Sequence, residues 1–385
     1  MPQNITHYLV IKESMKSTTD DLWNNFLNYA VFGSVMPDMF FMHEIQPPNY
    51  RGYNYTFLSD IIHWEGTLDL YCSILEIIKR QYRYSNDEFS KLRSFTYGYI
   101  SHVVSDIIFH PYIYRFSGDH WKFHNDCDKY IDHKNLELQI DCYLANKTES
   151  KAPLDFQYQN KIKCFENGSH ELDRDLFNIL QEAIENIYLS LIRENEYPEI
   201  YNKKCINEIV PDFEILDYRN PLYEVYDNYL QRIAGIYSGA ASDLMSFFFF
   251  KDMRPLGSLT EMQERINMNE LHTNWSGSDD TEINHSILEL YEMALSAVKR
   301  IIAISEEFFY GSSAYPRQFF MNQQHDYTFL QNNFNLDTGL KSRYNGDPFL
   351  LDKEKGSRFN FRLKELSKFY QKLDKEKNFS YFMHL

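Results

Sequence analysis

Three ionisable residues, spaced four apart in an otherwise apolar run, constrain this chain more than any other feature. They are His102, Asp106 and His110, and their neighbours include the apolar pairs and triplets Val103–Val104 and Ile107–Phe109. On an α-helix, positions i, i+4 and i+8 lie on one face. Burying three such groups costs free energy unless a partner satisfies them. Because neutral imidazoles and a carboxylate suit zinc as ligands, the run predicts a metal-binding helix.

A second pair of ionisable residues with helical spacing follows further along the chain. It consists of His133 and Glu137, again four apart, and Asp141 continues the same stripe. Each zinc ion takes about four ligands, so two such motifs on neighbouring helices are what a site with several metal ions requires. We expect Asp141 to lie behind the ligands and to orient a histidine ring.

Helical periodicity of the hydrophobic residues extends through most of the chain. Runs with strict alternation are rare, and the 385 residues include only 14 glycines and 12 prolines, which favours a packed helical protein. The predicted fold class is therefore all-α, a multi-helix fold with a helical C-terminal extension. We expect Pro111 to end the third of its helices. The predicted helices span residues 20–32, 56–82, 86–109, 129–144, 176–192, 223–250, 284–309 and 362–374.

The stretch from residue 257 to 280 is rich in Ser, Asn, Gly and Asp, which is typical of a long loop or a domain boundary. We therefore predict a helical domain over residues 1–250 that carries the metal site. A C-terminal extension over residues 251–385 is expected to pack on it.

The charge and the cysteines limit the partners and the compartment. The net charge is −16, and this average field disfavours binding to a nucleic-acid backbone. None of the five cysteines forms a CxxC pair, which indicates reduced, structural thiols. The N-terminus lacks the pattern of a secretory signal, and no apolar run approaches the roughly 18 residues of a membrane span. We therefore predict a cytoplasmic protein with no transmembrane segment.

The segment GYISHVVSDIIFHPYI, which contains the first motif, resembles the zinc-dependent phospholipase C family. That family shares its all-helical fold with the fungal single-strand nucleases. Three further segments resemble other motifs of the family and follow its order: Thr6–Tyr8, Gly33–Phe40 and Asp60–His63. The resemblance covers roughly residues 1–145.

This resemblance implies a zinc centre with two or three ions. Asp38 would also lie beside the attacking water, as a ligand and a possible general base. Asp106 would bridge the first and third ions. The implied ligands are Asp38, His63, His102 and Asp106 for a first zinc, His110, His133 and Glu137 for a second, and His7 for a third.

The chain departs from the family pattern at two places. Secreted members of the family begin with a tryptophan that ligates the third zinc, whereas this chain begins with Met1-Pro2. A third zinc is therefore either absent or held by another donor. The gap from Asp38 to His63 is also longer than in the family, so His43 competes for that position. His63 is preferred because it lies within a helical pattern.

The function implied by the resemblance is hydrolysis of phosphoric esters or phosphodiesters by water that zinc activates. The substrate would be a small-molecule or lipid phosphoester. The aromatic residues Tyr112, Tyr114 and Trp121 follow the first motif and either line a substrate cleft or pack in the core. Three alternatives remain: a zinc hydrolase or lyase acting on a small molecule without phosphate, a single-strand nuclease that stacks bases on these aromatics, and a non-catalytic protein that zinc stabilises.

Overall fold

The structure is a computed structural model, and it describes a defined set of the residues of the chain. These residues are 4–18, 22–40, 59, 62–63, 66–82, 86–117, 127–150, 161–164, 172–193, 286–322, 330, 334–336 and 340–341. Helices dominate them, which confirms the all-α prediction. Within this part of the chain the regular strands are β1 (Phe334–Asn335) and β2 (Leu340–Lys341), which form one short antiparallel ladder.

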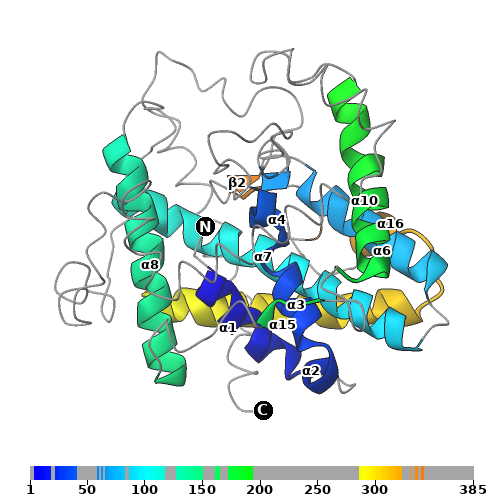
Figure 1. The fold of residues 1–385 in the computed structure, drawn as a ribbon, viewed down its shortest axis with the longest axis horizontal. Helices are drawn as coiled ribbons and strands as arrows, with labels where there is room; N and C mark the ends of the chain where they lie inside the picture. The colour runs from blue at the N-terminus through cyan, green and yellow to red at the C-terminus, as the bar shows by residue number, and fades with distance from the viewer. Residues whose placement is uncertain are drawn as a thin grey trace.

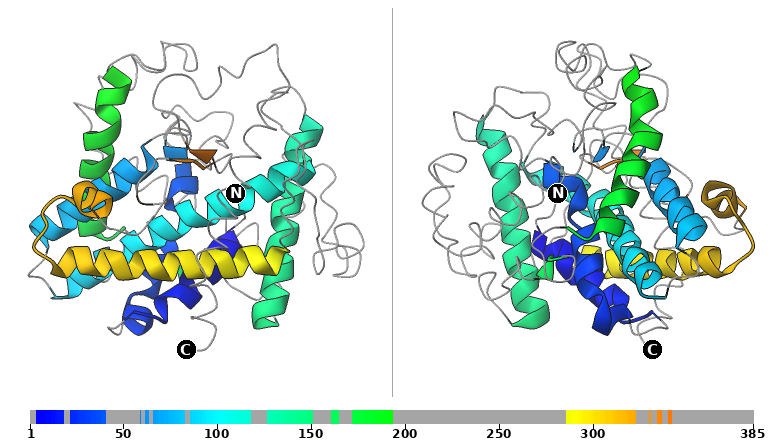
Figure 2. Two further views of the ribbon diagram at one scale, coloured as in Figure 1. Left: turned by 180° about the vertical axis from the view of Figure 1, so that it is seen from behind. Right: turned by 45° about the vertical axis from the view of Figure 1, so that its right-hand side comes forward.

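The long helix α7 (Asn86–Ser117) crosses the middle of the structure, and its most extensive contacts are with five other helices (Figure 1). Its residues from Leu92 to His110 are all buried, so no side of this stretch faces solvent. The helix α15 runs along its length, as the view from behind shows (Figure 2). These five helices are α1 (Asn4–Met15), α3 (Leu27–Gly33), α6 (Thr67–Gln81), α8 (Cys127–Glu149) and α15 (Ile287–Tyr310).

Helices α3 and α7 approach each other at two glycines. A Cβ atom on Gly98 would overlap the carbonyl of Ala30 and lie 2.7 Å from the backbone nitrogen of Ser34. A Cβ atom on Gly33 would likewise overlap the carbonyl of Phe95. Because only glycine lacks this atom, these two residues allow the two backbones to touch.

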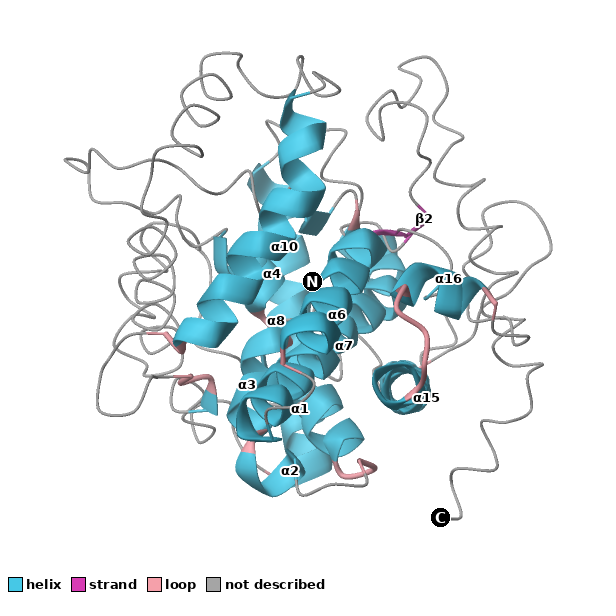
Figure 3. Cartoon of the chain, turned by 90° about the vertical axis from the view of Figure 1, so that its right-hand side faces the viewer, coloured by secondary structure: helices cyan, strands magenta, loops and turns pink. Residues whose placement is uncertain are grey.

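The remaining described helices surround this centre. Helix α2 (Leu22–Asn25) precedes α3, and α4 (Met36–Met39) follows it and contacts α7. Helix α10 (Arg174–Arg193) packs on α6, as does α16 (Pro316–Met321) (Figure 3). None of the described helices combines the length and the continuous apolar character needed to cross a bilayer.

Three expectations about helix boundaries were wrong. Pro111 does not end α7, which continues to Ser117. A proline inside a helix removes one backbone hydrogen bond, and burial of Tyr112 and Ile113 just after it offsets that cost. The expected helix over 20–32 is divided at Phe26 into α2 and α3. The expected helix over 56–82 is interrupted at Gly66, whose φ of 64° is left-handed, so α6 begins only at Thr67.

The other predicted helices are either confirmed or lie outside the described residues. The helices predicted over 129–144, 176–192 and 284–309 are confirmed as α8, α10 and α15. Sequence periodicity did not predict α1, because its residues from Asn4 to Ile11 are all buried and show no one-sided apolar stripe. The helices predicted over 223–250 and 362–374, and the domain boundary near residue 250, lie outside the described residues.

Candidate metal centre

Four side chains from three parts of the chain converge at the middle of α7. His102 and Asp106 lie one turn apart on α7, Asp38 lies on α4, and His63 lies on the helical turn before Gly66. Both imidazoles and Asp106 are fully buried, and Asp38 is 6% exposed. These are the four residues that the family resemblance groups around a first zinc.

Their donor atoms lie at separations that suit one small cation. His63 Nε2 is 3.0 Å from Asp38 Oδ1, 3.4 Å from His102 Nε2 and 3.8 Å from Asp106 Oδ2. His102 Nε2 is 3.1 Å from Asp106 Oδ2 and 3.9 Å from Asp38 Oδ1. Zinc bound tetrahedrally at about 2.0–2.1 Å keeps its donors about 3.3–3.4 Å apart. The five separations lie on either side of this value, and the donors of His63, His102 and Asp106 all lie close enough to one another to share one ion.

Backbone carbonyls orient both imidazoles of this group. His102 Nδ1 donates to the carbonyl of Ser34 at 2.9 Å, and His63 Nδ1 donates to that of Ser59 at 2.6 Å. A carbonyl only accepts, so each Nδ1 carries a proton, and in the neutral ring Nε2 keeps the lone pair that a metal ion requires. The Ser59 hydroxyl also donates to the carbonyl of Pro37, next to Asp38. This bond links the turn that carries His63 to α4.

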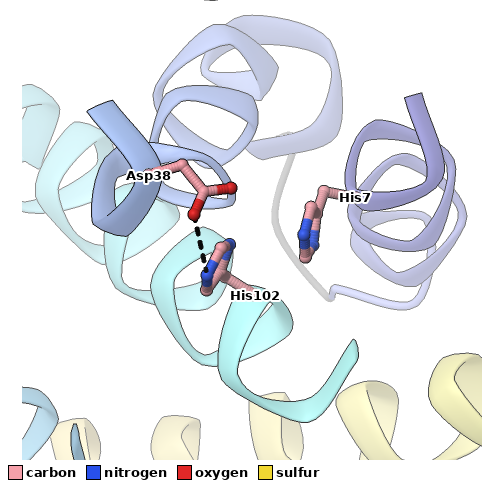
Figure 4. Close-up of side chains that lie close together, drawn as sticks. All are labelled: His7, Asp38 and His102. Carbon is pink, nitrogen blue, oxygen red and sulfur yellow. Dashed lines mark ion pairs between the residues drawn. The ribbon is translucent and has the colours of Figure 1, made fainter. Parts of the chain in front are cut away.

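His7 comes from α1 on the opposite side of the group (Figure 4). Its ring stacks on that of His102, with centroids 4.3 Å apart and an interplanar angle of 17°. Its Nε2 atom lies 3.3 Å from Asp106 Oδ1, the oxygen that does not face His102. His7, Asp38 and His102 form a second set of donors close enough to share an ion.

The pKa values of two of these groups favour the protonation states that metal ligands need. Burial, and then the neighbouring His102, lower the pKa of His7, so its imidazole is neutral. Burial alone would raise the pKa of Asp106, but His102 and His7 outweigh it and hold that pKa well below its usual range. A neutral imidazole and an ionised carboxylate are the forms in which these residues bind zinc.

A further pair lies one helical turn beyond Asp106. His110 on α7 and Glu137 on α8 are both buried, and His110 Nε2 is 3.9 Å from Glu137 Oε1. His110 Nδ1 donates to the carbonyl of Leu336. His133 lies on α8 one turn before Glu137, and its side chain is outside the described part. The structure therefore brings together two of the three residues that the resemblance groups around a second zinc.

Asp141 holds the beginning of the helix that carries His7. Its Oδ2 accepts from the backbone N–H of Ile5 at 2.9 Å. Its Oδ1 accepts from the N–H and the hydroxyl of Thr6 at 2.8 and 2.6 Å. The carboxylate thus binds the free N–H groups of the first turn of α1. Asp141 acts on His7 through the backbone of α1, a role that its spacing on α8 did not indicate.

Of the three residues predicted to bind substrate, the structure describes the side chain of Tyr112. Tyr112 is fully buried in the core, which agrees with the alternative that this ring packs instead of lining a cleft. The side chain of Tyr114, all of Trp121, and His43 lie outside the described part. A role in substrate binding for these residues stays a prediction.

Several buried polar atoms of the centre fit a bound zinc. Both ring nitrogens of His7, both oxygens of Asp106 and Oδ1 of Asp38 are buried and form no hydrogen bond. Leaving such atoms unsatisfied costs roughly 1–3 kcal/mol each. Because they are imidazole nitrogens and carboxylate oxygens that face one another, zinc satisfies them better than further hydrogen-bond donors would.

The structure also shows positioning groups that the sequence did not reveal. The acceptors for His102, His63 and His110 are all main-chain carbonyls. Every residue has such a carbonyl, so no residue type marks these positions. One signal was present: Gly33 and Gly98 open two of the segments that resemble family motifs. Their contact holds the Ser34 carbonyl against His102.

Comparison with known proteins gives one family. Residues 6–189, slightly less than half of the 385-residue chain, match the family model described as zinc dependent phospholipase C. No curated protein and no solved structure gave a match. The matched region contains every residue of the candidate centre except the Leu336 carbonyl.

Proposed function

We propose, from the premise that residues 6–189 of this chain belong to the zinc-dependent phospholipase C family, that the protein is a zinc-dependent hydrolase of phosphoric esters. The observation that carries the proposal is the four-donor group of Asp38, His63, His102 and Asp106. Five of its donor separations lie between 3.0 and 3.9 Å. The substrate class, a small-molecule or lipid phosphodiester, follows from the family alone.

The residues of the candidate centre would have two tasks in the reaction, to hold zinc and to accept a proton from water. His63, His102, Asp106 and Asp38 would hold one zinc, with His110 and Glu137 contributing to a second. Zinc in such a site supplies Lewis acidity towards a phosphoryl oxygen and lowers the pKa of water to about 7. Asp38 is the member of the first group with measurable exposure, at 6%. Its carboxylate is therefore the best placed to accept a proton from water at the edge of the centre.

The alternatives differ in what they predict. A single-strand nuclease would have to bind a polyanion despite the net charge of −16. A purely structural zinc would be closed by four protein ligands. The group around Asp38 also provides four donors, so it does not by itself distinguish a catalytic zinc from a structural one. Catalysis is supported by the slight exposure of Asp38 and by the second pair, His110 and Glu137.

The experiment measures zinc content by mass spectrometry and hydrolysis of three substrates by the purified protein. The substrates are a choline phospholipid in mixed micelles, single-stranded DNA, and a carboxylic ester. We expect at least one tightly bound zinc per chain and release of phosphocholine, with loss of both in Asp106→Asn. Removing a ligand of the Lewis acid forfeits several kcal/mol of transition-state stabilisation, which is at least about a 100-fold loss of rate.

Asp173→Asn is the matched control. Asp173 is also a buried aspartate, 6% exposed, but it caps α10 and accepts from the Tyr29 hydroxyl at 2.8 Å. This variant should keep its zinc and its activity. Full zinc content and unchanged turnover in Asp106→Asn would overturn the site. Cleavage of DNA or of the carboxylic ester alone would retain the zinc site and overturn the phospholipid assignment.

A further inference from the structure

A short C-terminal segment reaches the metal centre from outside the region that matches the family. Strand β1 pairs with β2 in the register Phe334 with Lys341 and Asn335 with Leu340. Leu336, the residue directly after β1, is fully buried. Figures 1 and 2 show this ladder beside α4, the helix that carries Asp38. The segment lies more than a hundred residues beyond residue 189, where the family match ends.

The main chain of Leu336 contacts two candidate ligands at once. Its N–H donates to the carbonyl of His63 at 2.6 Å. Its carbonyl accepts from Nδ1 of His110. His63 belongs to the four-donor group, and His110 pairs with Glu137 in the neighbouring group. One peptide segment therefore connects the two halves of the centre.

The chemistry of the second bond determines the state of His110. Because a carbonyl only accepts, His110 Nδ1 must carry a proton, and in the neutral ring Nε2 then keeps its lone pair for a metal ion. Partners of this kind fix the tautomer and orientation of a ligating imidazole and raise its basicity, and their loss typically costs 10–100-fold in metal affinity. The Ser34 and Ser59 carbonyls do the same for His102 and His63 within the matched region.

We propose that the main chain of Leu336 is a positioning element of the metal centre, so that the C-terminal region completes a site whose ligands all come from the first 140 residues. The proposal rests on the zinc function proposed above. It assigns to β1 and Leu336 the task of setting the tautomer of His110 and of holding the turn that carries His63. The side chain of Leu336 contributes through burial only.

The test changes single main-chain atoms in the full-length protein. Incorporating the α-hydroxy analogue of aspartate at Asp337 converts the peptide bond between Leu336 and Asp337 to an ester and weakens the Leu336 carbonyl as an acceptor. The analogue of leucine at Leu336 deletes the N–H that donates to His63. No side chain changes in either variant. We expect the first to lower zinc affinity 10–100-fold, measured by competition with a chelator, and the second to lower it by a smaller factor.

The matched control places the same ester at Ala314. That change weakens the carbonyl of Ser313. This carbonyl accepts a hydrogen bond from Lys79 Nζ at 2.7 Å, and no histidine of the centre takes part in that bond. The control should have unchanged zinc affinity. Equal zinc affinity in the Asp337 ester, the control and the unmodified protein would overturn the proposal.

A second readout separates this proposal from the proposed function. Nitrogen NMR of the zinc-free protein reports which ring nitrogen of His110 is protonated. We expect Nδ1–H in the unmodified protein and a mixture of tautomers in the Asp337 ester. An unmodified protein that binds no zinc but shows this tautomer shift would refute the zinc hydrolase and leave the positioning role standing. An unchanged tautomer would refute the positioning role whatever the zinc content.

Discussion

The two halves of α7 both bury ionisable side chains, but they satisfy them differently. In the first half, Arg93 is 1% exposed and its Nη1 donates to Glu306 on α15 at 2.8 Å. Tyr97 donates to the other oxygen of Glu306, and the hydroxyl of Tyr310 accepts from Arg93. A cation is paired with an anion there, and two tyrosine hydroxyls join the network.

In the second half, the buried groups face one another without such pairing. The atoms that converge from His63, His102 and Asp106 are all metal-ligand atoms, and both oxygens of Asp106 make no hydrogen bond. One helix thus carries a cation that pairs with an anion of α15, and further along it a cluster of ligand atoms of which several make no hydrogen bond. The difference indicates that burial of ionisable groups is common to both halves, and that unsatisfied ligand atoms around a common point are what distinguishes the candidate centre.

The largest effect should come from breaking the first network. Glu306→Gln leaves the guanidinium of Arg93 buried without its anion, which should lower the free energy of unfolding by about 3 kcal/mol. Zinc content should not change, because Glu306 is not among the donors of the centre. Denaturant titration and metal analysis on the same sample measure both quantities. A loss of zinc in Glu306→Gln, beyond that explained by unfolded protein, would show that the two halves of α7 are not independent.

A smaller effect is expected at the glycine contact that places α3 beside the centre. An alanine in a helix interior is normally about 1 kcal/mol more favourable than a glycine. At Gly98 the added Cβ would overlap the carbonyl of Ala30, so we expect destabilisation by about 2 kcal/mol instead. Moving α3 would also pull the Ser34 carbonyl from His102, and zinc affinity should fall about tenfold.

The direction in which stability and zinc affinity change tests this prediction. Thermal unfolding and a zinc competition titration of Gly98→Ala would show a lower melting temperature and weaker binding. Gly33→Ala should show the same pair of effects, because its Cβ would overlap the carbonyl of Phe95. A Gly98→Ala protein that is more stable and binds zinc normally would contradict the close contact.

The smallest effect, when counted per pH unit, concerns Asp141. Burial raises the pKa of Asp141 to about 7, although the bonds from Thr6 and Ile5 oppose the shift. The folded state therefore holds a proton that the unfolded state releases near pH 4. The corresponding stability is fully present below pH 4 and is lost as the pH rises to about 7, by at most about 1.4 kcal/mol per pH unit.

Asp141→Asn removes this titration. The free energy of unfolding is measured for both proteins in denaturant with a chelator present. The value for the unmodified protein minus that for Asp141→Asn should decrease from pH 5 to pH 7. The chelator is needed because Glu137 contributes to the shift and a bound cation would change its charge. A difference that stays constant over this range would contradict the raised pKa of Asp141.

How far the sequence could predict the centre depends on which contacts are local. His102, Asp106 and His110 share a helix face because of their spacing alone, and α7 and α8 were predicted from periodicity. His63 could be preferred over His43 only by its helical pattern, and it is His63 that lies 3.0 Å from Asp38. The buried helix α1 was missed because periodicity detects only helices with one polar face.

The sequence by itself therefore determined the helical class, the two ligand-bearing helices and the residue types of a zinc site. These follow from local geometry, because an α-helix completes one turn every 3.6 residues. Only the tertiary structure decided that Asp38, His63 and His7 meet on α7, and that Ser34, Ser59 and Leu336 orient the imidazoles through their carbonyls. Contacts between distant segments depend on how complete helices pack, and a main-chain carbonyl has the same chemistry at every position.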